Sequence, residues 1–203
     1  MMSNVLSVAL VLLAAGPGGG TGEPRSKEPS VADAGTKPSA AAGSETAVLA
    51  GGCFWGMEDL LRKLPGVIET EVGYAGGEVA SPSYEQVKTG TTGAAEALKV
   101  VFDPGVLSYD ALLRTYFRIH DPTTPNRQGN DVGTQYRSAI FVQSDAQQAV
   151  AERVRAEVDA SGKWKKPLVT EIVSGGSFFP AETYHQDYLE KHPGGYSCHW
   201  LRD

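Results

Sequence analysis

A pair of glycines near residue 50 separates two segments with different hydrophobic periods. Residues 47–50 form a continuous apolar run, which is typical of a buried strand, and Gly51 and Gly52 follow directly. Beyond the glycines, apolar residues at 57, 60, 61 and 64 repeat with the period of a helix, until Pro65 and Gly66 end the pattern. The sequence therefore predicts a strand, a tight turn and a helix over residues 54–64.

The same alternation of strand and helix patterns continues along the chain. Strands are predicted at residues 67–74, 96–102, 138–142 and 168–173, and helices at 108–120, 144–159 and 181–191. Residues 75–93 are rich in Gly, Ser, Thr and Pro, so we expect a long irregular segment there. This order predicts the α+β class: a ferredoxin-like two-layer α/β sandwich with a mixed sheet, helices packed on it, and an irregular Gly-rich C-terminal tail.

Two of the predicted helices have recognisable start signals. Ser108 is expected to cap the helix at 108–120, and Ser144 with Gln147 has the spacing of a capping box. In the helix that Ser144 begins, valines at 150, 154 and 158 lie on one face. We expect this face to pack against the sheet.

The first 45 residues differ in composition from the rest of the chain. An apolar run of about eleven residues at 5–15 is too short to span a bilayer and fits the core of a signal peptide, although no Lys or Arg precedes it. We expect residues 1–15 to be a signal peptide and 16–45 a disordered linker, because that segment is mostly Gly, Pro, Ala and Ser. Residues 46–203 are then one folded domain, exported to the periplasm or cell envelope, or cytoplasmic if the leader is not functional.

Charge and cysteine content narrow the possible functions. A net charge of −6 without a cluster of Lys and Arg argues against nucleic acid as a partner. Nothing in the pattern indicates an oligomer, so we expect a monomer. The two cysteines, at 53 and 198, allow one bridge, one metal pair or one redox pair.

Cys53 lies where the predicted turn meets the predicted helix. Free backbone N–H groups and the helix dipole at such a position favour a thiolate, so we expect the thiol pKa to be lowered. Phe54 and Trp55 beside it would form an apolar pocket suited to a thioether or a methyl group. The alternatives are a small buried cysteine and ordinary core aromatics.

Glu96 is a carboxylate on an apolar strand face. Alternation along residues 96–102 places it on the same face as Leu98, Val100 and Phe102. Burial there would raise its pKa and make it a general acid. The alternative is a solvent-exposed position at the end of the strand.

Several motifs in order resemble one enzyme family. GCFWG at 52–56, TGAAE at 92–96 before a strand ending VVFDP, QGNDVGTQYRS at 128–138 and PAETYHQDYL at 180–189 are similar to the A-type peptide methionine sulfoxide reductases. The resemblance covers residues 47–200, so it implies that the folded domain is catalytic. One position departs from the family pattern: Ala94 stands where the family commonly has a histidine, which leaves the activity level and pH dependence open.

The resemblance implies a substrate, a reaction and a set of site residues. The substrate would be the S epimer of methionine sulfoxide, free or in oxidised proteins, and no cofactor is needed. Cys53 would attack the sulfur and become a sulfenic acid, with Glu96 supplying a proton to the sulfoxide oxygen. The substrate-binding residues would be Phe54 and Trp55 for the methyl group, Tyr84 and Tyr136 around the oxygen, and Asp131, which helps to order the site.

The resemblance also assigns the second cysteine. Cys198 matches the family's resolving position in the tail, where Gly194 and Gly195 would let it reach the sulfenic acid. Thioredoxin or a thioredoxin-like protein would then reduce the disulfide between Cys53 and Cys198. A static disulfide between the two cysteines is the alternative.

Other functions use the same residues differently. A cysteine hydrolase would pair Cys53 with His120 or His185, and a methionine-binding module would need the aromatics without the thiol. A thiol–disulfide oxidoreductase would need Cys-x-x-Cys, but Gly56 stands at the last position of that pattern. A zinc site would draw on His185, His192, Cys198 and His199, whose spacing matches no common zinc motif.

Overall fold

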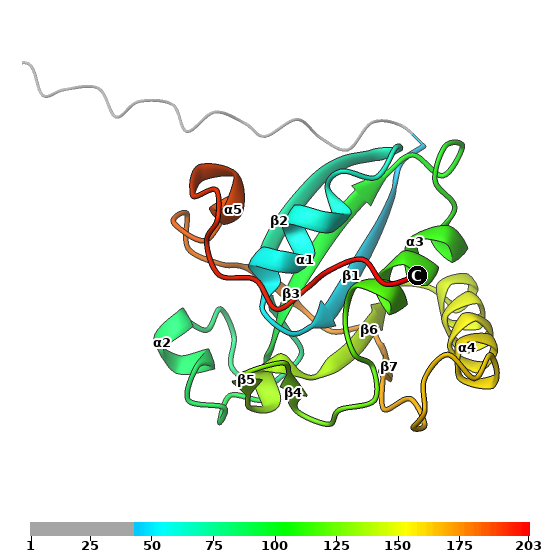
Figure 1. Cartoon of the computed structure of the whole chain (residues 1–203). Coiled ribbons are helices and arrows are strands. Elements are labelled where there is room, and N and C mark those ends of the chain that lie inside the picture. The colour runs from blue at the N-terminus through cyan, green and yellow to red at the C-terminus, as the bar shows by residue number, and fades with distance from the viewer. Residues whose placement is uncertain (1–42) are drawn as a thin grey trace, which may run out of the picture. The chain divides into compact units, whose positions relative to one another are not determined.

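The computed structural model describes residues 43–203 (Figure 1). The predicted signal peptide and nearly all of the predicted linker lie outside these described residues. The first strand, β1 (Glu45–Gly51), begins one residue before the predicted start of the domain. Within residues 43–203, we find no helix with the length and apolarity to cross a membrane.

One mixed sheet of six strands, in the order β7-β6-β1-β3-β2-β8, forms the centre of the described domain. All neighbouring strands are antiparallel except β6 and β7, which are parallel. Besides β1, its strands are β2 (Val67–Ala75), β3 (Ala95–Phe102), β6 (Ser138–Val142), β7 (Glu171–Ser174) and β8 (Phe178–Pro180). The predicted α+β class and ferredoxin-like arrangement are confirmed, since β6-β1-β3-β2 is the central antiparallel unit of that fold.

The three longer helices pack beside the sheet (Figure 1). They are α1 (Phe54–Leu61), α3 (Tyr109–Ile119) and α4 (Asp145–Ala160). Two further helices, α2 (Tyr84–Val87) and α5 (Tyr188–Lys191), have one turn each. A small hairpin of β4 (Arg127–Gln128) and β5 (Asp131–Val132) leads into a 3₁₀ helix, Thr134–Tyr136.

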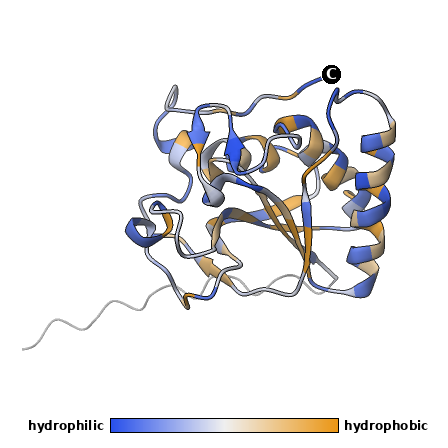
Figure 2. Cartoon of the chain, turned by 90° about the horizontal axis from the view of Figure 1, so that it is seen from below, coloured by the Kyte–Doolittle hydropathy of each residue, from blue (hydrophilic) through white to orange (hydrophobic). Residues whose placement is uncertain are grey.

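Residues on β3 alternate between two buried clusters, as the sequence predicts. Leu98, Val100 and Phe102 belong to the main core between the sheet and the helices, whereas Ala95 and Ala97 belong to a smaller cluster. Figure 2 shows the apolar strands in the middle of the domain, with helices of mixed hydropathy packed beside them. The face that carries Leu98 is the face on which Glu96 was predicted, so the register of β3 turns that carboxylate inward.

The predicted helix starts are confirmed, with one difference in detail. The Ser108 side chain accepts a hydrogen bond from Ala111 N, and the Ser144 side chain accepts one from Gln147 N. The Gln147 carboxamide oxygen accepts from Gln143 N instead of from Ser144 N, so the capping box is only half formed. On α4, Val154 is buried, and the predicted valine face packs on the main core.

Some predicted elements are shorter in the structure, and others were not predicted. The helix at 54–64 ends at Leu61, the helix at 181–191 shrinks to α5, and the strand at 168–173 begins only at Glu171. The short helix α2 lies inside the segment that was expected to be irregular. Residues 181–187 are held by hydrogen bonds to other parts of the chain in place of helical ones. The Gln186 side chain accepts from Val72 N and donates to Val72 O, and Asp187 has a left-handed φ of 56°, which does not fit a helix.

Candidate active site

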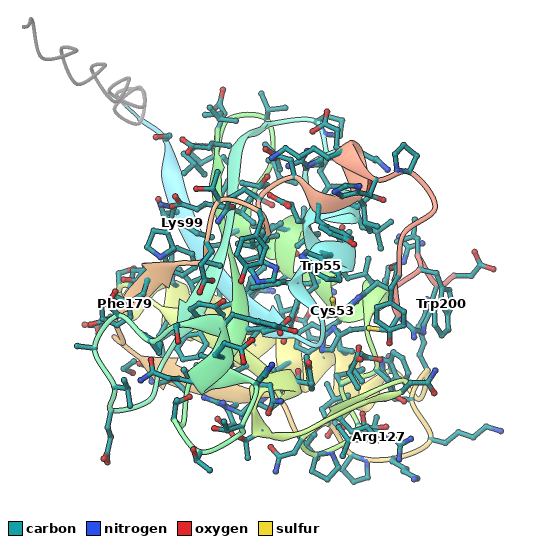
Figure 3. The ribbon with its side chains drawn as sticks, turned by 90° about the vertical axis from the view of Figure 1, so that its left-hand side faces the viewer. Cys53, Trp55, Lys99, Arg127, Phe179 and Trp200 are labelled. Atoms are coloured by element: carbon teal, nitrogen blue, oxygen red, sulfur yellow. The ribbon has the colours of Figure 1, made fainter. Side chains whose placement is uncertain are left out.

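A pocket of about 150 Å³ opens beside the turn between β1 and α1. Figure 3 shows Cys53 and Trp55 close together near the middle of one side of the molecule. Eight residues line the pocket: Cys53, Phe54, Trp55, Tyr84, Glu96, Asp131, Tyr136 and Tyr196. The structure thus brings together every predicted site residue except Cys198, which lies on the tail two residues beyond Tyr196.

Cys53 is the N-cap residue, directly before the first residue of α1, and its thiol is buried, with 6% of the residue exposed. Burial raises its pKa well above the ordinary value; the charge of Glu96 adds to this, and the Trp55 backbone N–H opposes it. The prediction of a lowered pKa is therefore wrong for this closed site. Desolvation outweighs the helix N-terminus, so Cys53 is a thiol before substrate arrives.

Glu96 is buried on β3, with 2% of its surface exposed, as predicted. Its Oε2 atom accepts a hydrogen bond of 3.1 Å from Phe54 N, the first N–H of α1. Burial, together with the charge of Asp131, raises the pKa of Glu96 to about 8 against the opposing effect of the hydrogen bond from Phe54 N. The carboxyl group therefore carries a proton at neutral pH, and the solvent-exposed alternative is wrong.

Phe54 and Trp55 form an apolar wall of the pocket. The Trp55 ring stacks on Tyr188 of α5, with centroids 3.8 Å apart and planes 12° apart. Its Nε1–H donates to His185 Nδ1 at 3.2 Å, and the His185 ring is also 5.1 Å from Phe54. These contacts fix the indole plane, so the wall is formed before any ligand binds.

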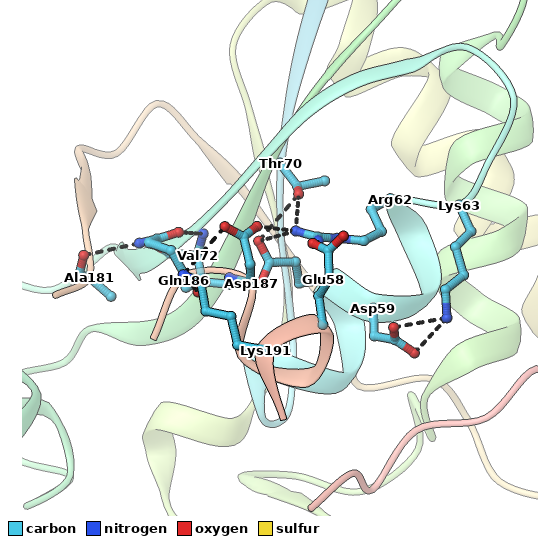
Figure 4. Close-up of polar contacts among 11 residues, drawn as sticks. Glu58, Asp59, Arg62, Lys63, Thr70, Val72, Ala181, Gln186, Asp187 and Lys191 are labelled. Carbon is cyan, nitrogen blue, oxygen red and sulfur yellow. Dashed lines mark hydrogen bonds and ion pairs between the residues drawn. The ribbon is translucent and has the colours of Figure 1, made fainter. Parts of the chain in front are cut away.

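A polar cluster around the buried Glu58 of α1 holds the segment that supports this wall (Figure 4). Glu58 accepts hydrogen bonds from Thr70 Oγ1 at 3.2 Å and from Asp187 N at 2.9 Å, and it pairs with Arg62 at 3.0 Å. Arg62 also pairs with Asp187 and Glu190. The cluster ties α1 to the residues on either side of Asp187, which include His185 and Tyr188.

Two phenols and a carboxylate complete the polar side of the pocket. Burial, followed by the charge of Glu96, raises the pKa of Tyr84 and of Tyr136, so both hydroxyl groups remain hydrogen-bond donors at neutral pH. Asp131 accepts a 2.9 Å hydrogen bond from the Tyr196 hydroxyl group. The pocket therefore pairs an apolar wall with neutral donors around Glu96.

The C-terminal tail packs directly on the turn that carries Cys53. Three glycines, Gly52, Gly56 and Gly129, form what we call the tail seat: a methyl group built on each would lie 3.3 Å or less from a tail side chain. At Gly56 such a methyl would lie 2.5 Å from Ser197 Oγ. The absent side chains leave room for the protein's own tail at Gly56, and for both Gln128 and the tail at Gly52.

Cys198 is seated there as a free thiol, with 8% of the residue exposed, and Cys53 is likewise free. Burial, followed by a hydrogen bond with Asp131, raises the pKa of Cys198 to about 12. Both cysteines are therefore protonated and covered in this state, and no disulfide joins them here.

Sequence reasoning missed Tyr196 and treated His185 and His199 only as candidates for other functions. Tyr196 lines the pocket, His185 supports Trp55, and His199 contacts both Cys198 and Gly51. The available signal was that Tyr196 and His199 flank Cys198 closely in sequence. Nothing in the sequence placed His185 beside Trp55, because 130 residues separate them.

The geometry does not favour the hydrolase or zinc alternatives. His120 bonds Tyr116 O and Ser138 Oγ, and His185 bonds Trp55, so both histidines have partners other than Cys53. Among residues 43–203, no group of three or more His, Cys, Asp or Glu side chains is arranged to hold a metal ion.

Comparison with known proteins agrees with this geometry. The family model described as Peptide methionine sulfoxide reductase matches residues 45–202. A relative from Mesorhizobium japonicum, Peptide methionine sulfoxide reductase MsrA 1, is 58% identical over 162 residues, which are 80% of this chain and 92% of the relative.

Solved structures show the same fold. The reduced form of Mxr1 from Saccharomyces cerevisiae superposes with a TM-score of 0.75 at 41% identity, over 80% of this chain and 94% of that one. A structure of Mxr1 in complex with Trx2 gives a TM-score of 0.57 at 29% identity, over 83% and 97% of the two chains.

Proposed function

Because the chain belongs to the peptide methionine sulfoxide reductase family, we propose that it reduces the S epimer of methionine sulfoxide, free or in oxidised proteins, to methionine. The observation that carries the proposal is the buried Glu96 carboxyl group, whose pKa is raised by burial, in the same pocket as the Cys53 thiol and an apolar wall. A sulfoxide oxygen leaves sulfur only when it is protonated, so a buried neutral acid is the group that this reaction needs.

In the first step, the Cys53 sulfur attacks the sulfoxide sulfur while Glu96 gives its proton to the sulfoxide oxygen. The hydroxyl group then passes to the Cys53 sulfur, the sulfur–oxygen bond of the substrate and the transient bond between the two sulfurs both break, and methionine leaves with Cys53 as a sulfenic acid. The proton lost by the Cys53 thiol replaces the one that Glu96 gave. Cys53 is thereby oxidised by two electrons and the substrate is reduced by two.

The layout of the pocket also accounts for a preference between epimers. Phe54 and Trp55 offer an apolar surface for the methyl group, whereas Tyr84, Tyr136 and Glu96 offer donors for the oxygen. The apolar wall fixes the methyl group, the donors fix the oxygen, and Cys53 must face the sulfur. Only one of the two epimers can meet these three conditions while its side chain points out of the pocket. We assign this arrangement to the S epimer from the family membership.

The second step regenerates the thiol through Cys198. Its sulfur attacks the sulfenic sulfur of Cys53, the hydroxyl group leaves as water, and a disulfide forms. A thioredoxin-like protein then reduces the disulfide, which the complex of the yeast relative with Trx2 supports. From the leader composition alone, we also propose that the protein works outside the cytoplasm, with a donor available there. We further propose that it acts as a monomer.

The test is turnover of separated epimers. The full chain with dithiothreitol should reduce a peptide that contains the S sulfoxide and leave the R sulfoxide unchanged, and Cys53→Ser should abolish the reaction. Reduction of the R epimer would contradict the assigned handedness. Binding of the S peptide without any methionine formation would instead favour the methionine-binding alternative.

A further inference from the structure

His199 is a buried histidine to which the steps above give no role. It follows Cys198 in the tail, and its Nδ1 atom lies 3.4 Å from Cys198 Sγ. Its Nε2 atom lies 2.8 Å from Gly51 O, the carbonyl two residues before Cys53. The ring thus bridges the resolving thiol and the turn that carries the nucleophile.

These two contacts determine which nitrogen carries the proton. A carbonyl oxygen can only accept a hydrogen bond, so Nε2 must be the donor to Gly51. Burial lowers the pKa of His199 to about 4, so the ring is neutral and has one proton only. The lone pair on Nδ1 therefore faces Cys198 Sγ and can accept the thiol proton, for which the Asp131 carboxylate is the competing acceptor.

The His199 ring is also held in place by a hydrogen bond of its own backbone and by packing on the tail seat. His199 N donates to Ser197 Oγ at 3.2 Å, and the absent side chain of Gly56 leaves the space that Nδ1 occupies. The ring cannot turn without losing the bond to Gly51. The orientation of the lone pair toward Cys198 is therefore fixed by the fold.

We propose that His199 is a further catalytic residue: the general base that removes the Cys198 proton as Cys198 attacks the sulfenic acid of Cys53. The proposal rests on the proposed function, because it concerns the second half of that cycle. A protonated thiol is a poor nucleophile, and a buried one needs a nearby base to ionise.

The step balances without another reagent. Nδ1 takes the proton from Cys198, the sulfur–sulfur bond forms as the sulfur–oxygen bond of Cys53 breaks, and the departing oxygen receives that proton and leaves as water. His199 ends the step neutral. The charged and titratable groups around the ring are Arg202 and Asp131, which act on its pKa in opposite directions, together with Cys198 and His120.

The experiment separates the two halves of the cycle in the full chain. Wild type and His199→Gln are mixed with the S sulfoxide peptide without reductant, and both methionine release and disulfide formation are followed from pH 6 to pH 9. His192→Gln, the same substitution at an exposed histidine, is the matched control. A parallel series uses hydrogen peroxide in place of the sulfoxide, since peroxide also converts a cysteine to the sulfenic acid.

We expect His199→Gln to release methionine at the wild-type rate and to form the disulfide about 100-fold more slowly at pH 7. The wild-type rate of disulfide formation should change little with pH, whereas the variant's rate should rise steeply because hydroxide must replace the missing base. The rescue by high pH is the sign that a merely structural role would lack.

Two results would overturn the proposal. One is an unchanged rate of disulfide formation in His199→Gln, and the other is a slower rate with the same pH profile as wild type, since that indicates a misplaced tail. The peroxide series separates this inference from the proposed function. If disulfide formation after peroxide depends on His199 but no methionine is released from the sulfoxide, the result supports this inference and contradicts the proposed function.

Discussion

Glu96 is a single residue on which both the chemistry and its pH dependence rest. Its carboxyl group holds a proton up to about pH 8 because burial disfavours the charged form. Removing the carboxyl group leaves the shape of the pocket but no acid for the sulfoxide oxygen. We expect Glu96→Gln to slow methionine formation in a single turnover by about 10²- to 10⁴-fold.

The pH profile provides the second half of this prediction. A raised pKa means that the active, protonated form is present below pH 8 and is lost above it, so the wild-type rate should fall as pH rises through about 8. That fall should be absent in Glu96→Gln. Glu152→Gln, on the exposed side of α4, is the control, and near-normal reduction by Glu96→Gln would exclude the general-acid role.

At this scale the sequence predicted the position and the raised pKa of Glu96, but not the pKa of Cys53. The inward position of Glu96 followed from strand alternation alone, whereas the pKa of Cys53 depends on burial by segments distant in sequence and was predicted in the wrong direction. Ala94, where the family commonly has histidine, is buried in the main core. The site residues lie together without an imidazole at that position.

At the scale of elements, the tail seat connects α1 to the C-terminal tail. Gly56→Ala should displace the tail, because the added methyl would lie 2.5 Å from Ser197 Oγ and 2.6 Å from His199 Nδ1. We expect methionine release to continue and disulfide formation to slow at least about tenfold, since Cys198 is no longer seated beside Cys53.

The displacement can be measured directly as faster alkylation of Cys198 by iodoacetamide in a Cys53→Ser background. Gly105→Ala, in the turn after β3, is the matched control. Alkylation of Cys198 at the same rate in Gly56→Ala as in the control would show that the tail accommodates the methyl group.

The polar cluster around Glu58 is the second element-scale feature, and it explains a failed prediction. Residues 181–187 have the composition of a helix, but Glu58 binds Asp187 N and Gln186 binds β2, so tertiary bonds hold them in turns. Such long-range bonds carry no local sequence signal. By contrast, β1, β6 and the start of α1 could be predicted from the sequence. Apolar runs indicate the two strands, and Gly51 and Gly52 indicate the turn before the helix.

Glu58→Ala tests the cluster. It leaves the partly buried N–H of Asp187 without an acceptor and should lower the free energy of unfolding by about 1–3 kcal/mol. Chemical denaturation would measure this, and KM for the sulfoxide peptide should rise because Trp55 loses support from His185 and Tyr188. Asp59→Ala, which removes an exposed pair with Lys63 on the same helix (Figure 4), should cost about 0.5 kcal/mol or less. Equal losses in the two variants would contradict the prediction.

At the scale of the whole molecule, the closed state covers both thiols. Cys53 is 6% exposed beneath the pocket rim, and Cys198 is 8% exposed on the tail seat. A small reductant can enter the pocket, but a protein reductant needs a sulfur that the tail presents at the surface. The tail is therefore the part of the molecule through which a thioredoxin-like donor would act.

Cys198→Ser separates these two routes. The variant should release one methionine per molecule from the S sulfoxide peptide and then stall when thioredoxin is the only donor, because the sulfenic acid on Cys53 is buried and no disulfide forms. Dithiothreitol, which is small enough to reach the pocket, should restore repeated turnover. Continued cycling of Cys198→Ser with thioredoxin alone would show that the donor reaches Cys53 directly, and the role of the tail as a relay between the pocket and the surface would then be excluded.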